Sequence, residues 1–109
     1  MFWKYCFLNI LRRLGSRQIR NVGTIGGNLG NGSPIADIPP ILFAWDAALE
    51  LVGSDGNRRS VPVCEFYKGY KETLLQDCEY IAKIRVPSQS INDFHRFYKV
   101  SKRLEDDIS

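Results

Sequence analysis

The residues with the clearest chemical potential lie in one glycine-rich stretch between Arg20 and Pro40. Five of the nine glycines fall between Gly23 and Gly32, interspersed with two asparagines. Both residue types accept backbone conformations that others avoid, and glycine lets successive backbone N–H groups point into one concavity that holds an anion. The stretch therefore predicts a cofactor loop that binds phosphate, rather than an ordinary helix or a central strand.

The glycines follow neither of the common phosphate-loop patterns. The chain has no G-x-x-x-x-G-K-[ST], and no G-x-G-x-x-G that leads from a strand into a helix. A glycine-rich turn between two packed elements is the structural alternative, and glycine density alone does not decide between the two. The following residues favour the anion site, because Asp37 suits a helix N-cap and Pro39 and Pro40 suit a first helical turn.

The segments around this stretch show the patterns of regular structure. Apolar residues at helical spacing predict a helix from Trp3 to Leu14, ended by Gly15, and a short helix over residues 40–48. Alternating apolar and polar residues predict four strands, the first two forming a hairpin: 49–52, 58–62, 79–86 and 93–101. Residues 63–70 are expected to be a short helical or irregular segment. Strands joined by turns predict an α+β fold, an antiparallel sheet with flanking helices.

Composition argues against several classes of function. Fifteen basic and 12 acidic residues are mixed along the chain and leave a net charge of only +3, which argues against a nucleic-acid-binding protein. Three cysteines without a C-x-x-C pair and a single histidine predict neither a disulfide framework nor a metal site. Polar residues interrupt the apolar N-terminus, so neither a membrane span nor a targeting segment is expected, and reduced cysteines indicate the cytoplasm.

Four ordered motifs carry a resemblance to a known family: TIGGN at 24–28, SPIAD at 33–37, FYK at 97–99 and RLEDDI at 103–108. Over nearly all of the chain after Ile10, the sequence resembles the FAD-binding domain of the molybdenum hydroxylases, in particular the small flavin subunit of bacterial xanthine dehydrogenase. The resemblance implies the second subdomain of a two-subdomain FAD-binding fold, similar to vanillyl-alcohol oxidase and the CO dehydrogenase flavoprotein.

The resemblance also implies cofactor contacts for the glycine-rich motif. It places Thr24, Ile25, Gly26, Gly27 and Asn28 along the pyrophosphate and ribityl chain of FAD. The hydroxyl group of Thr24 is expected to add one donor to the backbone N–H groups.

Three further residues receive cofactor roles by resemblance. Asp37 is expected to contact the flavin cofactor, the backbone at Ile81 to meet the flavin, and Lys99 to reach the flavin ring, where a cation favours the reduced, anionic form. Each residue also has a structural explanation. Asp37 could serve as a helix cap, Ile81 as a buried strand residue, and Lys99 as a solvated surface lysine. The acidic cluster 105–107 is expected to be structural, and no catalytic or metal-binding residue is assigned.

The function implied by the resemblance is electron transfer through FAD. A molybdenum site would oxidise hypoxanthine or xanthine and pass the electrons to iron–sulfur centres. These centres would reduce FAD, and FAD would reduce NAD. The implied partners are an iron–sulfur domain and a molybdopterin-binding subunit. Two alternatives stay open: an isolated nucleotide- or anion-binding module, and an inactive truncated product.

The resemblance divides the chain into two parts. Residues 1–15 are expected to form an N-terminal helix partly outside the family match, and residues 16–109 a partial FAD-binding domain, truncated at both ends. The family's first subdomain, which brings another glycine-rich loop to the pyrophosphate, has no counterpart here. Leu14 stands where an aromatic residue often lies near the flavin.

Overall fold

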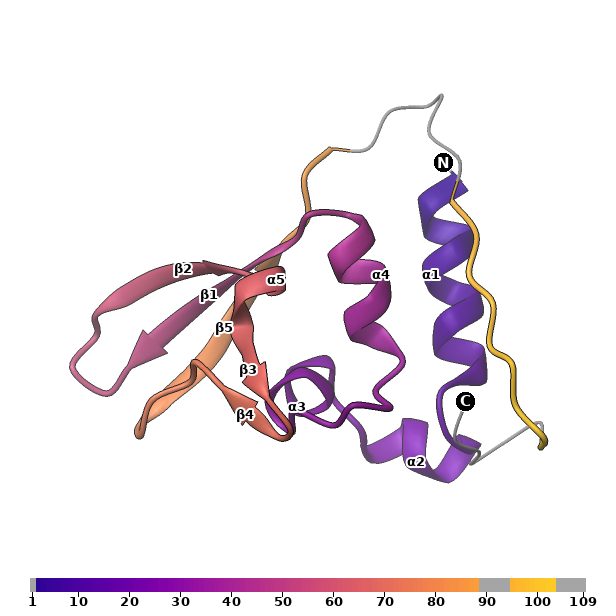
Figure 1. The fold of residues 1–109 in the computed structure, drawn as a ribbon, viewed down its shortest axis with the longest axis horizontal. Coiled ribbons are helices and arrows are strands. Elements are labelled where there is room, and N and C mark those ends of the chain that lie inside the picture. Colours follow the sequence, from indigo (N-terminus) through magenta and orange to yellow (C-terminus); the bar gives the residue numbers. More distant parts are fainter. Residues whose placement is uncertain (1, 89–94, 104–109) are drawn as a thin grey trace.

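The computed structural model describes residues 2–88 and 95–103, in which helices lie beside a small antiparallel sheet (Figure 1). The predicted α+β fold is confirmed. In chain order the elements are α1 (Phe2–Arg13), α2 (Arg17–Val22), α3 (Ile25–Gly30), α4 (Ile38–Ala44), β1 (Ala48–Gly53), β2 (Arg58–Pro62), α5 (Val63–Phe66), β3 (Tyr67–Gly69), β4 (Glu72–Thr73) and β5 (Glu79–Arg85). None of the helices in these described ranges is long and apolar enough to cross a membrane.

β1 is the central strand of a three-stranded antiparallel sheet with the order β2-β1-β5. The predicted hairpin of β1 and β2 is confirmed, with Gly56 at a φ of +82° in its turn. The register between β1 and β5 shifts after Glu50, which faces Lys83, while the next residue of β1 already faces Ile81. This bulge brings Ile81 and Ile84 onto the core, although strict alternation predicts them on opposite faces.

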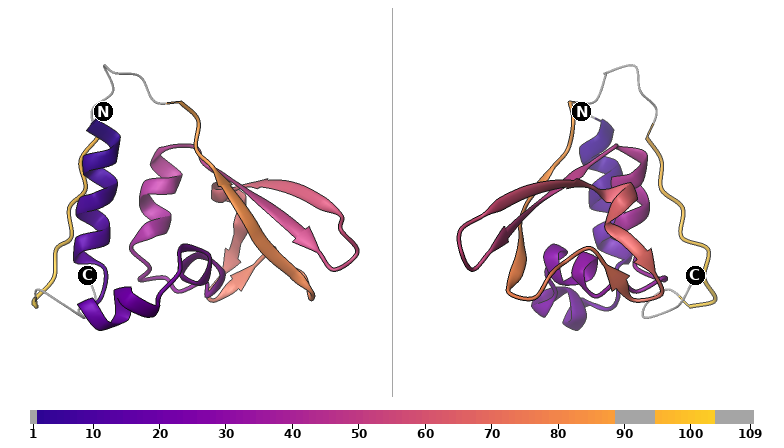
Figure 2. Two further views of the ribbon diagram at one scale, coloured as in Figure 1. Left: turned by 180° about the vertical axis from the view of Figure 1, so that it is seen from behind. Right: turned by 60° about the vertical axis from the view of Figure 1, so that its left-hand side comes forward.

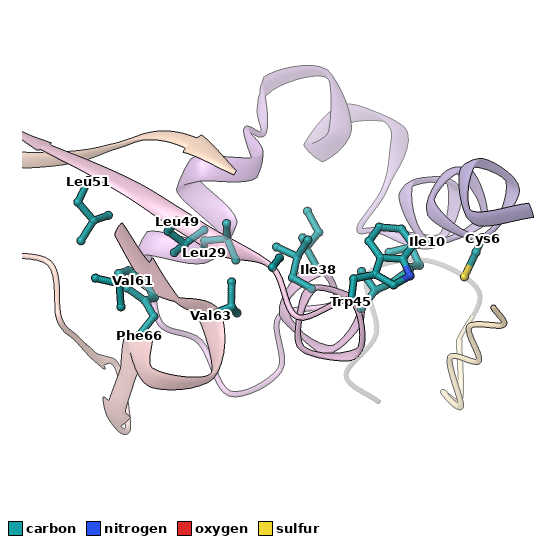
Figure 3. Packing of buried hydrophobic residues seen from close by; sticks show 13 residues of the cluster. Cys6, Ile10, Leu29, Ile38, Trp45, Leu49, Leu51, Val61, Val63 and Phe66 are labelled. Carbon is teal, nitrogen blue, oxygen red and sulfur yellow. The ribbon is translucent and has the colours of Figure 1, made fainter. Parts of the chain in front are cut away.

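One core joins the inner face of the sheet to the helices (Figure 3). Leu49 and Leu51 of β1 are fully buried, and so are Leu29 of α3 and Phe66 of α5. The core continues through α4 to Ile10 of α1, so the apolar face predicted for the first helix is covered. This core fixes α3 and α4 against the sheet, and α1 against α4.

The glycine-rich stretch is where the structure departs furthest from the sequence prediction. Residues 25–30, predicted not to form a helix, are the short helix α3. Thr24 caps it, since its Oγ1 accepts a hydrogen bond from the N–H of Gly27 at 2.9 Å, and Leu29 anchors it in the core. Within the stretch only Gly32 has a positive φ, +64°.

Two other segments also differ from expectation. The second predicted helix, 40–48, forms closer to the N-terminus as α4. Its prolines occupy the first helical turn, and the helix ends before Asp46, whose φ is +52°. The segment 63–70 contributes α5 and then β3, which pairs with β4. Residues 17–22, for which no regular element is predicted, form α2 with Ser16 as its N-cap.

The strand predicted over 93–101 is not formed within the described residues. The part from residue 95 to 103 pairs with no strand there, and it runs alongside α1 (Figures 1 and 2). Residues 93 and 94 of that predicted strand and the acidic cluster 105–107 lie outside the described residues.

Two carboxylates tie the sheet together through arginines. Glu50 accepts hydrogen bonds from Arg85, at 2.8 Å, and from Arg58, and these two bonds lower its pKa. Glu79 accepts from Arg59 at 2.8 and 2.9 Å and from the N–H of Gln76, which lower its pKa as well.

The stability of the chain is therefore expected to depend on pH in the acid range. A carboxyl whose folded pKa is depressed stabilises the fold above its unfolded value, here about 4.5, and this contribution is lost as the pH falls through the folded value. Urea denaturation at a series of pH values measures the dependence. The Glu50→Gln variant should show a shallower loss between pH 5 and the acid limit, and an unchanged slope would contradict the assignment.

Candidate functional site

Two adjoining pockets lie where α1, α2 and α3 meet the loop before α4. The first, of about 500 Å³, is bounded by apolar side chains of α1 and α2 and by the start of α3. The second, of about 640 Å³, runs from α3 to Asp37 and Lys99. They share Leu14, Ile19, Gly27 and Asn28, and together they form one groove, here called the α3 groove.

The groove gathers most of the residues that the sequence singles out. Four of them line its first pocket, namely Thr24, Ile25, Gly27 and Asn28, and the last two also line the second pocket with Asp37 and Lys99. The sequence reasoning therefore selects residues that lie together, although Asp37 and Lys99 are distant along the chain.

Gly26 and Ile81 lie apart from the lining of these pockets. Gly26 is in the first turn of α3, where a Cβ atom would meet nothing within 4 Å, so open space borders its backbone. Ile81 lies on β5 beneath α3, with its Cδ1 4.0 Å from where a Cβ of Gly30 would stand. It supports the far end of α3, and a contact between its backbone and a flavin stays a prediction.

The first turn of α3 combines a cap with unused donors. Thr24 accepts from the N–H of Gly27 through its hydroxyl oxygen and from that of Asn28 through its carbonyl, at 2.9 and 3.0 Å. The preceding N–H groups, of Ile25 and Gly26, have no acceptor within the helix. A Cβ atom at Gly27 would lie only 2.9 Å from Thr24 Oγ1, so glycine is needed there for the cap itself.

The side chain of Asn28 in α3 has a buried polar atom that no contact within the described structure satisfies. Its Oδ1 is buried and has no hydrogen-bond partner among the described residues. A buried polar atom left without a partner is costly, so native proteins rarely keep one without a ligand, water or neighbour to satisfy it. Because Asn28 lines both pockets, the unsatisfied group is at their junction.

Asp37 and Lys99 form a buried ion pair at the other end of the groove. Lys99 Nζ lies 2.8 Å from Asp37 Oδ2 and 3.3 Å from the carbonyl oxygen of Arg13, and the two side chains are only 5% and 13% exposed. Asp37 occupies the N-cap position of α4 but makes no capping hydrogen bond, because its own backbone is helical and its carboxylate faces Lys99. Two of the structural explanations therefore do not hold: Asp37 does not cap α4 through its side chain, and Lys99 is not solvated.

Two residues that hold the helices around the groove are not predicted from the sequence. Arg20 donates to the carbonyl oxygens of Leu14 and Gly15 at 3.1 and 3.2 Å, which holds the corner between α1 and α2. Tyr67 donates its hydroxyl to the carbonyl oxygen of Leu29 at 2.9 Å and so fixes the end of α3, and burial raises its pKa to about 12. No local sequence pattern indicates either of these contacts.

Solved structures share this fold. Carbon monoxide dehydrogenase from Hydrogenophaga pseudoflava superposes with a TM-score of 0.82 at 34% identity, over 89% of this chain and 33% of that chain. Quinoline 2-oxidoreductase from Pseudomonas putida 86 gives 0.68 at 28% identity, over 76% of this chain and 30% of that one.

Sequence relatives agree with the structural ones. Xanthine dehydrogenase/oxidase of Rattus norvegicus is 39% identical over 100 residues, and xanthine dehydrogenase of Emericella nidulans is 38% identical over 100 residues. These matches cover 91% of this chain, which spans only 7% of either relative's length.

A family match covers the part of the chain that builds most of the groove. Residues 5–89 match the FAD binding domain in molybdopterin dehydrogenase, a range that includes α3 and Asp37 but ends before Lys99. The match begins within α1, so most of the N-terminal helix falls inside it. With the fold and the sequence in agreement, the chain belongs to the FAD-binding domain family of the molybdopterin dehydrogenases.

Proposed function

We propose that the α3 groove is this chain's share of the FAD site. The observation that carries the proposal is the buried Oδ1 of Asn28, left without a partner where the two pockets meet. The groove offers what the parts of FAD require: free N–H donors for a diphosphate, a buried amide for the hydroxyl-bearing chain, and an apolar wall.

The start of α3 supplies the diphosphate contacts in this proposal. The N–H groups of Ile25 and Gly26 donate to phosphate oxygens, at the positive end of the short helix. The bare edge of Gly26 admits the diphosphate close to the backbone, and Asn28 meets the ribityl hydroxyls. The Thr24 hydroxyl, which accepts from Gly27, still has its own proton to donate.

Asp37 and Lys99 belong to the flavin end of the proposed site. The Lys99 ammonium is held within the groove lining by Asp37, so its position is fixed before any ligand arrives. The paired carboxylate offsets part of its charge, and the remaining field favours a ligand that gains negative charge on reduction. When bound, FAD accepts and releases electrons, and the residues of this chain hold and tune it.

We infer the wider role from the relatives. An oxidoreductase of the molybdenum hydroxylase type would couple this FAD site to iron–sulfur clusters and molybdopterin on other domains or chains. NAD as electron acceptor and a purine as substrate fit the xanthine dehydrogenases among the relatives. We also propose that residues 16–109 form a partial FAD-binding domain, whose pyrophosphate site is completed by a segment outside this chain.

Titration of the 109-residue chain with FAD, followed by amide NMR shifts, tests the proposal. The shifts are expected at residues 24–28, and Asn28→Ala should weaken binding by about tenfold, the effect of one lost hydrogen bond of ~1.4 kcal/mol. Thermal stability should hold, since the alanine removes an unsatisfied buried group. Asn21→Ala, at an exposed position on α2, is the matched control. Shifts confined to residues outside the groove would refute the site.

A further inference from the structure

The C-terminal end of α3 is held by the hairpin of β3 and β4, which lies beside it (Figure 1). The hydroxyl of Tyr67 on β3 donates to the carbonyl oxygen of Leu29 at 2.9 Å. The same oxygen accepts from the N–H of Gly32 at 3.3 Å, so Tyr67 makes the shorter of these two bonds. The last carbonyls of a helix have no partner within its hydrogen-bond ladder, and Tyr67 supplies one from outside.

A second contact joins the same hairpin to the residues that follow α3. At Gly32 a Cβ atom would lie only 3.1 Å from the Cα of Lys71, in the turn of the hairpin. Gly32 also has a φ of +64°, so glycine is required there both for the backbone conformation and for this close approach. The hairpin therefore contacts the end of α3 at two points, one on β3 and one in the turn.

The hairpin is itself anchored in the core. Phe66, directly before β3, is fully buried, and its carbonyl oxygen accepts from the N–H of Leu74 at 2.8 Å, across the base of the hairpin. The ring of Tyr67 lies 5.0 Å from the ring of Phe66, edge to face, and 6.2 Å from that of Phe43. Because two neighbouring rings hold the tyrosine ring, the position of its hydroxyl is fixed by packing.

The short helix α3 depends on such contacts from outside. Three of its six residues are glycine, which is a weak helix former. The side chain of Leu29 is buried in the core, and that of Asn28, next to it, lines the α3 groove. A rotation of α3 about its axis would move Asn28 and the N–H groups of the first turn relative to the groove. The bond from Tyr67 to the Leu29 carbonyl resists that rotation.

We propose that Tyr67 is a positioning residue of the FAD site. Its hydroxyl acts through the carbonyl of Leu29, sets the rotation of α3, and so directs Asn28 and the N–H donors of the first turn towards the ligand. Tyr67 lies apart from the lining of the α3 groove and does not touch the cofactor in this proposal. A hydrogen bond weakens when its donor or acceptor is displaced, so a bond behind the site changes the binding in front of it. The inference rests on the proposed function of the α3 groove.

The variant Tyr67→Phe tests the proposal, because it removes the hydroxyl and keeps the ring. FAD titration of the 109-residue chain, followed by amide NMR shifts well below the melting temperature, should give a dissociation constant about tenfold higher than that of the parent chain. Hydrogen exchange at the amides of residues 28–31 should be faster in the ligand-free variant. Tyr70→Phe makes the same change on the same hairpin at a side chain that is 75% exposed, and it should alter neither measurement.

A second control separates positioning from a general loss of stability. Val61 is buried on β2, so Val61→Ala should lower the melting temperature at least as much as Tyr67→Phe does. At a temperature where the chain stays folded, that loss should leave the dissociation constant of FAD within about twofold of the parent value. If Val61→Ala and Tyr67→Phe weakened FAD binding equally, Tyr67 would have a structural role only.

The parent chain distinguishes this proposal from the proposed function. If FAD shifts residues 24–28 of the parent chain and Tyr67→Phe binds FAD equally tightly, the positioning role is refuted and the FAD site stands. If FAD shifts none of the groove residues of the parent chain, the FAD site is refuted and the role of Tyr67 falls with it. In that case faster exchange in α3 would show a bond that stabilises the helix and nothing more.

Discussion

Replacing Lys99 by methionine is expected to lower the free energy of unfolding by about 3–5 kcal/mol, because it leaves the carboxylate of Asp37 buried without its cation. The side chain of Lys99 is 5% exposed and that of Asp37 13%, so water from the groove can only partly replace the lost cation. Urea denaturation measures the loss. Lys102→Met, an exposed lysine three residues along, should change stability by less than about 0.5 kcal/mol.

The double variant Asp37→Asn with Lys99→Met separates structure from ligand binding. It removes both charges, so much of the stability should return. FAD binding should stay weak if the Lys99 ammonium contacts the flavin, as we propose. Recovery of both stability and binding would reduce Lys99 to a structural role, and a single variant as stable as the parent chain would contradict the buried pair.

The sequence predicts the elements whose patterns are local. α1 shows apolar residues at helical spacing and a glycine stop, and the β1–β2 hairpin shows alternation around turn residues. Both are found. The bulge opposite Glu50 is not encoded by either strand alone, since it arises from how β5 fits β1 over the core.

Helix α3 could not be predicted from its own residues. Each glycine in a helix costs about 1 kcal/mol relative to alanine, and three of its six residues are glycine. The opposing contributions are the Thr24 cap and the complete burial of Leu29, and the second of these depends on the sheet. Resemblance assigns the motif to a family of FAD-binding domains, and the family match confirms that family. The resemblance does not give the helical shape of the motif's backbone, and its contact with FAD stays a prediction.

Residues 95–101 and the Asp37–Lys99 pair both show that local sequence patterns do not predict contacts between distant parts of the chain. Alternation correctly indicates the extended character of residues 95–101, but a strand also needs a partner, and none lies in the described part of the chain. Lys99 and Asp37 are 62 residues apart, so no pattern in either neighbourhood announces their contact. Resemblance placed both near one cofactor, and the structure adds the bond between them.

Gly26→Ala should raise the stability of the free chain while it weakens FAD binding, and Gly27→Ala should lower both. Gly26 is helical and a Cβ atom there meets nothing within 4 Å, so alanine gains up to about 1 kcal/mol of helix propensity. The same methyl group stands where we propose that the diphosphate approaches the backbone.

At Gly27 a Cβ atom would lie 2.9 Å from Thr24 Oγ1 and displace the cap, which is worth typically ~1 kcal/mol. Valine at either position should abolish detectable FAD binding, because its branches block close approach to the diphosphate. Thermal melting and FAD titration of the four variants measure both effects. If Gly26→Ala gained stability and bound FAD as the parent chain does, the diphosphate would not lie over Gly26, and the contact would have to move along α3 toward Asn28.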